Sequence, residues 1–254
     1  MKSSSSLKSF LGGLALLATP AALAQDSTTS IPAFEAKMSA ARATTSPSGA
    51  TVTRQELVDA LAAFGGVDAS ERAYLATKVG NSTFLTGLTA AAKKQLTDFH
   101  ELNDAAEFGA PLGMSAVAGT PAELFGASGA LSSARIKEGY IPNGAGVANQ
   151  VTLTDTYGAA FGSSYDNGYF FEPITPRELI SMLQSNTEGT PTADEVDGAV
   201  AYITQISRNS NRLYVSGWRT MGRGGPGEAA GFVVAAVSTD RRFVRMVEFL
   251  SWAE

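Results

Sequence analysis

The sequence predicts an α+β fold in which N-terminal helical hairpins are followed by an antiparallel β-meander with inserted helices. Two patterns support this prediction. Between residues 53 and 107, apolar side chains recur at steps of three and four, the period of an amphipathic helix. After residue 149, short apolar segments are separated by turn residues, as is typical of strands. We therefore expect a single domain over residues 51–254, helical over about 53–137 and mixed or β over about 149–254.

The first 24 residues carry the pattern of a cleaved secretory signal peptide. Lys2 and Lys8 precede an apolar run over residues 10–18, and small residues at 22–24 form a cleavage site before Gln25. The apolar run is too short to span a bilayer as a helix. We expect this peptide to be removed, leaving a soluble mature protein without stable membrane insertion, in the periplasm or outside the cell.

Helix signals dominate the next part of the chain. Residues 25–50 mix Ser, Thr, Pro and Gly around one brief helical pattern, and we expect a flexible leader there. At Thr53, the order Thr-Arg-Gln-Glu is typical of a capping box that starts a helix, and a second box begins at Asp68. A third helix is predicted between residues 85 and 106, where the apolar side chains share one helical face.

Strand signals follow a less informative middle segment. Residues 109–149 are rich in Gly, Ala and Ser and predict only a short helix after Thr120. Residues 151–156 alternate like a strand, and residues 161–174 predict a β-hairpin that turns at Asn167-Gly168. Two more helices and then three strands are expected, at Thr175, at Thr192, and over residues 212–219, 231–237 and 243–252.

Two stretches of the chain are similar to each other. Residues 53–82 and 175–210 share two capping boxes and an Asn-Ser pair in the same order. An ancient duplication would produce this order. Chance would also produce it, because capping boxes look alike for physical reasons. The similarity leaves both explanations open.

Charge is distributed unevenly along the chain. The formal net charge is −5, and removal of the two signal-peptide lysines makes it −7. Residues 25–198 hold 20 carboxylates and 10 cationic side chains. The remaining 56 residues hold four carboxylates and seven arginines, which are Arg208, Arg212, Arg219, Arg223, Arg241, Arg242 and Arg245. These arginines either pair with carboxylates of the same chain or bind an anionic ligand or polymer. No nucleic acid is expected, because this charge is too small.

Several catalytic classes are excluded by composition. The chain has no cysteine, which rules out disulfides, thiolate chemistry and thiolate metal sites. His100 is the only histidine, and we expect Asp104, four residues further along the helix, to hold it. Residues 222–227 have the glycine spacing of a dinucleotide-binding fingerprint. They include Pro226, however, and a strand-like segment follows where a helix is needed. We predict no catalytic residue with a recognisable motif and no metal site.

The segment over residues 155–172 is the best predicted binding surface, because it combines aromatic rings with carboxylates and an amide. The candidate ligand-binding residues are Tyr157, Tyr165, Asp166, Asn167 and Tyr169, with Arg219 and Arg223 beside the glycine-rich loop. Asp155, Asp166 and Glu172 are weak candidates for the acid and base of a glycosidase. Calcium at Asp166 and Asn167 stays open, although no specific motif supports it, and no other cofactor is predicted.

These observations favour an exported, non-enzymatic protein that binds a glycan, a polyanion or an envelope protein through the aromatic-rich hairpin. One alternative is a secreted carbohydrate-active hydrolase that uses paired carboxylates. Another is a structural or assembly component of the cell envelope, which would present an exposed sheet edge or an apolar patch. The sequence leaves the specific ligand, the reaction and the oligomeric state undetermined.

Overall fold

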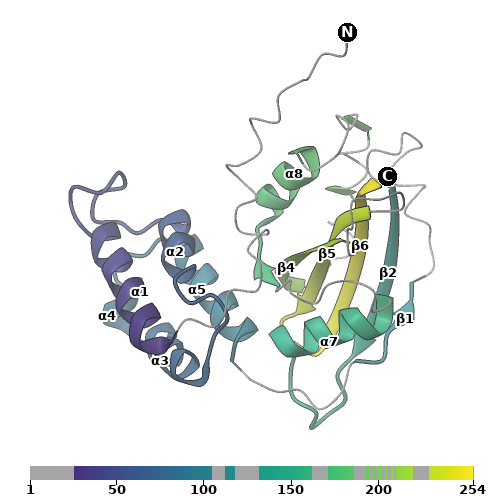
Figure 1. The fold of residues 1–254 in the computed structure, drawn as a ribbon, viewed down its shortest axis with the longest axis horizontal. Helices are drawn as coiled ribbons and strands as arrows, with labels where there is room; N and C mark the ends of the chain where they lie inside the picture. The colour runs from purple at the N-terminus through teal and green to yellow at the C-terminus, as the bar shows by residue number, and fades with distance from the viewer. Residues whose placement is uncertain are drawn as a thin grey trace.

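The fold is α+β, with helices in the N-terminal half and an antiparallel sheet in the C-terminal half (Figure 1). The computed structural model describes residues 26–104, 112–117, 132–161, 171–185, 210–219 and 229–253, and eight single positions between 193 and 208. Residues 1–25, and with them the predicted signal peptide, lie outside the described residues. Within the described ranges, no helix is both long enough and apolar enough to cross a membrane.

Five helices form the group at the left of Figure 1, which we call the helical half. They are α1 (Ser27–Ala41), α2 (Arg54–Leu61), α3 (Ala69–Val79), α4 (Ser82–Leu85) and α5 (Ala90–Leu102). Both predicted capping boxes are confirmed. In the first, the Thr53 hydroxyl accepts the Glu56 amide at 3.3 Å, and the Glu56 carboxylate accepts the Thr53 amide at 2.8 Å. The predicted third helix is shorter than expected and corresponds to α5.

The prediction of a flexible leader was wrong for residues 27–41, which form α1. The Asp26 side chain caps the helix, and Phe34 is fully buried with its ring centroid 5.1 Å from that of Phe64. The hydroxyl of buried Ser30 donates to the carboxylate of Glu71 in α3. The many Ser and Thr residues made this segment look like a linker, whereas Phe34 and Met38 fix it to the core.

The sheet has six antiparallel strands in the order β1-β2-β6-β5-β4-β3. They are β1 (Ser115–Ala116), β2 (Ser132–Tyr140), β3 (Glu172–Pro173), β4 (Ser210–Arg219), β5 (Ala229–Ser238) and β6 (Phe243–Ala253). The predicted meander over β4, β5 and β6 is confirmed. Strand β2 was not predicted. It begins at Ser132, within the range of about 53–137 that was expected to be helical, so that predicted limit was too late. We call residues 112–253 the sheet half.

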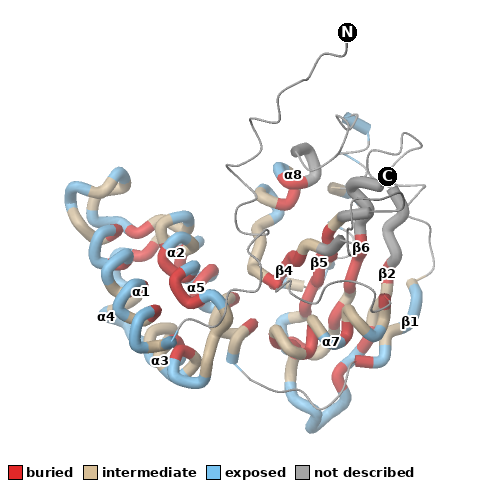
Figure 2. The backbone as a smooth tube through the Cα atoms, in the orientation of Figure 1, coloured by how far each residue is buried: buried red, intermediate tan, exposed pale blue. Residues whose placement is uncertain are grey.

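Two helices, α7 (Gln150–Phe161) and α8 (Pro176–Ser185), lie between β2 and β4 in the chain and cover opposite faces of the sheet (Figure 1). In β5, Phe232, Val234 and Ala236 pack in the cluster that includes Leu179 and Met182 of α8. The alternate residues, which are Val233, Ala235 and Val237, pack in the cluster that includes Leu153 and Phe161 of α7. Strand β5 is therefore buried on both faces, as its red colour in Figure 2 shows.

The strand predicted over residues 151–156 is wrong, because this segment belongs to α7. Its β-branched residues suggest a strand, but Leu153, Thr156 and Phe161 fall on one helical face that is buried against the sheet. The Asn149 side chain accepts the Thr152 amide at 3.0 Å and so caps the helix.

Little of the predicted hairpin over residues 161–174 is described. Phe161 ends α7, and the turn at Asn167-Gly168 lies outside the described residues, as does the short helix expected after Thr120. Strand β3, the described part of the predicted second hairpin strand, pairs with β4. The helix predicted at Thr175 is confirmed as α8, and the described positions between Ala193 and Thr204 are helical.

Candidate functional site

The two described carboxylates of the hydrolase alternative lie on opposite faces of the sheet. Glu172 in β3 pairs with Val215 in β4, and residues opposite each other in an antiparallel pair share a face. Val215 belongs to the cluster under α8, so Glu172 is on that face. Asp155 is exposed on α7, which covers the other face. These two groups cannot flank one glycosidic bond, and Asp166 lies outside the described residues.

Glu172 nevertheless has an unusual environment. Its side chain is half-buried, and burial raises the pKa of its carboxyl to about 7. Among the residues with described side chains, none forms a hydrogen bond or ion pair with this carboxyl. The group therefore titrates near neutral pH, but within the described ranges no second carboxylate contacts it to act with it as an acid and base.

The aromatic candidates are only partly described. Tyr157 lies on α7 and donates from its hydroxyl to Oε1 of the buried Glu248 of β6 at 2.8 Å, so it helps to hold α7 against the sheet. Arg219 lies in β4, where its backbone pairs with Ala230. The other predicted ligand-binding residues, Tyr165, Asp166, Asn167, Tyr169 and Arg223, lie outside the described residues, as does the suggested calcium site.

The prediction that Asp104 holds His100 was wrong, because the Asp104 carboxylate binds Arg241 instead. His100 is half-buried on α5. In the described ranges, no three His, Asp or Glu side chains are grouped in a way that would hold a metal ion. The glycine-rich residues 222–227 themselves are not described, but strand β5 begins at Ala229, where a dinucleotide site needs a helix.

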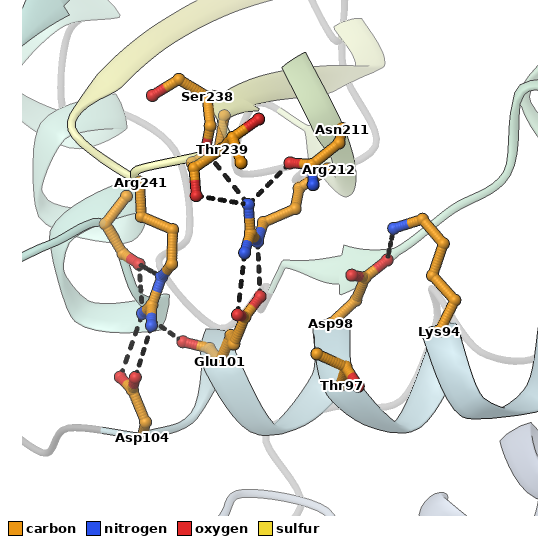
Figure 3. A network of polar contacts seen from close by, with 12 residues as sticks. Lys94, Thr97, Asp98, Glu101, Asp104, Asn211, Arg212, Ser238, Thr239 and Arg241 are labelled. Carbon is orange, nitrogen blue, oxygen red and sulfur yellow. Dashed lines mark hydrogen bonds and ion pairs between the residues drawn. The ribbon is translucent and has the colours of Figure 1, made fainter. Parts of the chain in front are cut away.

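The best-defined polar cluster joins the C-terminal end of α5 to the sheet (Figure 3). Arg212 of β4 forms a forked ion pair with Glu101 of α5. Arg241 of the β5–β6 turn forms a second one with Asp104, just after the end of α5. Arg212 Nη2 lies 2.8 Å from Glu101 Oε1, and its Nε bonds to Oε2. Arg241 Nη1 and Nη2 lie 2.6 and 3.1 Å from the two Asp104 oxygens. We call these four residues the α5 junction.

The remaining donors of these two guanidinium groups bind backbone oxygens and one side-chain amide. Arg241 Nε and Nη2 donate to the Ala148 carbonyl at 3.1 and 2.7 Å, and Nη2 also donates to the Glu101 carbonyl. Arg212 Nη1 donates to the carbonyls of Ser238 and Thr239 and to the Asn211 side chain, at 3.1, 3.2 and 2.6 Å. Every guanidinium nitrogen of both arginines therefore donates a hydrogen bond within the chain, and neither group keeps a pair of unbonded nitrogens for an external anion.

The surroundings of Glu101 favour its charged form. Burial alone would raise the pKa of the Glu101 carboxyl, but the hydrogen bond and charge of Arg212 lower it below its usual value. One helical turn earlier, burial raises the pKa of Asp98, and Lys94, with Nζ 2.5 Å from Oδ2, opposes this effect (Figure 3). The charged groups of the α5 junction therefore have a structural role, because they bind one another within the chain.

Two further arginines of the C-terminal part are also held within the chain. Arg245 Nε lies 2.8 Å from Glu138 Oε2, and Arg242 donates from Nε and Nη2 to the Ile141 carbonyl at 3.3 and 2.8 Å. Internal pairing with carboxylates is thus confirmed for Arg212, Arg241 and Arg245. Of the two explanations that the sequence left open, the structure supports the internal one for these three arginines.

One aromatic surface lies at the end of β2 and the start of β6. Tyr140 is 71% exposed, and its ring centroid lies 4.7 Å from that of Phe243 at an interplanar angle of 45°. Arg245 Cζ lies 5.3 Å from the centroid of the Phe243 ring. Tyr140 pairs with Phe243, and Glu138 pairs with Arg245, so all four side chains share one face. We call these four residues the Tyr140 surface.

Polar groups beside the rings remain available for a ligand. Arg245 uses Nε and Nη2 to bind Glu138 Oε2. In the described part of the chain, Glu138 Oε1 and Arg245 Nη1 form no hydrogen bond. Their side chains are 35% and 23% exposed, respectively. The surface therefore offers an aromatic ring, one acceptor and one donor, held on two neighbouring strands.

Comparisons with known proteins assign no class to this arrangement. No family model matches the chain, and neither a curated protein nor a solved structure shows significant similarity to it. Three structural features bear on function: the exposed Tyr140 surface, the internally paired arginines of the α5 junction and the separation of Asp155 from Glu172.

Proposed function

We propose that this chain is an exported, non-enzymatic binding protein that contacts its ligand through the Tyr140 surface. The observation that carries this proposal is the 71% exposure of Tyr140, the one large hydrophobic side chain exposed in the described ranges. Exposed aromatic rings with neighbouring polar groups are typical of binding sites, because the ring supplies apolar area while the polar groups fix the orientation. Export is proposed from the pattern of residues 1–24.

The strand pairing supports the proposal, because it makes the surface rigid. Tyr140 and Phe243 are opposite each other on β2 and β6, and both strands are paired along most of their length. Arg245 is fixed over Phe243 by its ion pair with Glu138. A ligand that binds here meets side chains already in place, which lowers the entropy cost of binding.

The hydrolase alternative has less support. Its described carboxylates, Asp155 and Glu172, are separated by the sheet. Three of the seven C-terminal arginines, Arg212, Arg241 and Arg245, are paired with carboxylates of the chain and so give less support to a polyanion as ligand. Binding at a surface, without chemistry, therefore agrees best with the geometry.

A thermal-shift screen of the purified protein tests this proposal. The ligands are neutral oligosaccharides, a heparin fragment and calcium, and the variants are Tyr140→Ala and Tyr140→Phe, the second of which retains the ring. We expect one ligand class to raise the melting temperature of the wild type and of Tyr140→Phe but not of Tyr140→Ala. Equal shifts in Tyr140→Ala, or no shift with any ligand class, would contradict the proposal.

A further inference from the structure

We propose that the ligand of the Tyr140 surface is a neutral sugar ring, packed against Tyr140 and hydrogen-bonded by Glu138 and Arg245. This inference rests on the proposed binding function and adds the chemical class of the ligand. It follows from three properties of the surface, which are its apolar size, its free hydrogen-bonding groups and its charge.

The apolar part of the surface has the size of one ring. Tyr140 is exposed by 71%, and Phe243 beside it is half-buried. An aromatic side chain buries at most about 150–250 Å², whereas a stable protein–protein contact covers about 800 Å² on each partner. The aromatic face therefore suits the C–H face of a single sugar ring better than a folded protein partner.

The free polar groups match the hydroxyls of a sugar. Glu138 Oε1 can accept one hydrogen bond, and Arg245 Nη1 can donate one. Both atoms belong to side chains that the ion pair holds in place. Two hydroxyls, one donating and one accepting, would satisfy both groups. Because Glu138 is two residues before Tyr140 on β2, these contacts lie on the same face as the ring.

Charge favours a neutral ligand over an anionic one. The Glu138 carboxylate balances the Arg245 guanidinium, so the pair carries no net charge. A phosphate or a sulfated polymer placed on Arg245 would meet the Glu138 carboxylate and be repelled. Arg242 is held on the Ile141 carbonyl, and Lys137 is on the opposite face, where its Nζ donates to the Ala160 carbonyl. Calcium is also disfavoured, since Glu138 is the one carboxylate of the surface.

Isothermal titration with neutral hexasaccharides and a heparin hexasaccharide tests the inference. The variants are Tyr140→Ala, Tyr140→Phe, Glu138→Gln and, as a control in the helical half, the exposed Lys93→Ala. We expect Tyr140→Ala to lower the affinity for a neutral sugar about tenfold, while Tyr140→Phe and Lys93→Ala retain it. Glu138→Gln replaces an ionised acceptor by a neutral one, and we expect it to lower the affinity for the sugar about threefold to tenfold.

The same titrations separate the two proposals. Heparin binding that requires Tyr140, without binding of any neutral sugar, would overturn the inference but leave the binding function of the surface intact. Sugar binding that is equally tight in Tyr140→Ala would overturn both. A Glu138→Gln variant that binds the sugar as tightly as the wild type would overturn the role of the Glu138–Arg245 pair. Circular dichroism of each variant verifies that it is folded.

Discussion

The helical half and the sheet half are stabilised in different ways. The helical half has one core, in which Phe34, Phe64 and Leu96 pack together, and α2 and α3 begin at capping boxes formed by residues three positions apart. The sheet half has one cluster on each face, and its strands pair residues far apart in sequence, such as Glu138 with Arg245. Local contacts therefore determine the first half, and long-range pairing determines the second.

The two halves meet through charged groups and through Leu102 of α5, which packs in the apolar cluster between α7 and the sheet. The α5 junction connects α5 to β4 and to the β5–β6 turn. A second contact joins Arg54 of α2 to Glu178 of α8, and Arg54 Nη2 lies 3.4 Å from the Pro173 carbonyl. The uneven charge along the chain thus has a structural role, because arginines of the second half bind carboxylates of the first. The Tyr140 surface, the proposed ligand-binding site, lies in the sheet half.

Phe34→Ala should give the largest effect. If α1 is an integral part of the helical core, loss of this buried ring lowers the free energy of unfolding by about 3–5 kcal/mol. The exposed Ala36→Ser on the same helix is the control. Urea unfolding followed by far-UV circular dichroism measures both. A Phe34→Ala variant as stable as Ala36→Ser would restore the description of this segment as a flexible leader.

Arg241→Met should have the next largest effect. The substitution leaves the Asp104 carboxylate and the carbonyls of Glu101 and Ala148 without their donor, in a site where Arg241 is 9% exposed. We expect a loss of about 3 kcal/mol in the free energy of unfolding. Arg208→Met, at an exposed arginine, is the matched control. Chemical denaturation of the two variants should differ clearly, and equal stability would show that the α5 junction contributes nothing.

Glu172→Gln should change how the stability depends on pH. In the folded protein the pKa of Glu172 is raised from 4.5 to about 7, so its stabilising contribution is complete below the unfolded value and is lost as the pH rises through 7. Each unit is worth about 1.4 kcal/mol, and water at this half-exposed side chain reduces that. Between about pH 5 and about pH 8.5, we expect the wild type to lose ~1–2 kcal/mol more than Glu172→Gln. Parallel pH profiles of the two proteins would be the contrary result.

Two equivalent caps allow a smaller test in both halves. The hydroxyls of Thr53 and Thr175 accept the amides of Glu56 and Glu178 at 3.3 and 3.2 Å. We expect Thr53→Ala and Thr175→Ala each to lower the free energy of unfolding by about 1 kcal/mol, with most of the loss restored by serine. Urea midpoints measure these differences. Serine variants as unstable as the alanine variants would indicate that the methyl group, rather than the cap, is important.

The confirmed parts of the sequence analysis depend on neighbouring residues. Capping boxes at Thr53, Asp68 and Thr175 involve positions three apart, and the β4–β5–β6 meander has short connections. Strand β2 was missed because its state depends on pairing with β6, more than 100 residues later. The strand predicted at 151–156 was wrong because packing against the sheet outweighed its β propensity.

The candidate site was predicted even less well, for the same reason. Aromatic density drew attention to residues 155–172, whereas Tyr140 and Phe243 are single aromatic residues that meet through the pairing of β2 with β6. The spacing of Ile136, Glu138 and Tyr140 at every second position, which places them on one face of a strand, was the available sequence signal for β2. Internal pairing of the arginines was one of two explanations considered, but the identity of their partners required the fold.

We infer that the α5 junction couples the folding of the helical half to that of the sheet half. The two tryptophans, Trp218 and Trp252, lie in β4 and β6, so fluorescence reports on the sheet half. Most of the helical residues in the described ranges are in α1–α5, so far-UV circular dichroism reports on the helical half as well. In urea, the wild type should unfold with coincident transitions by the two probes. In the double variant Arg212→Met/Arg241→Met we expect the transitions to separate. Coincident transitions in the double variant would contradict the claim.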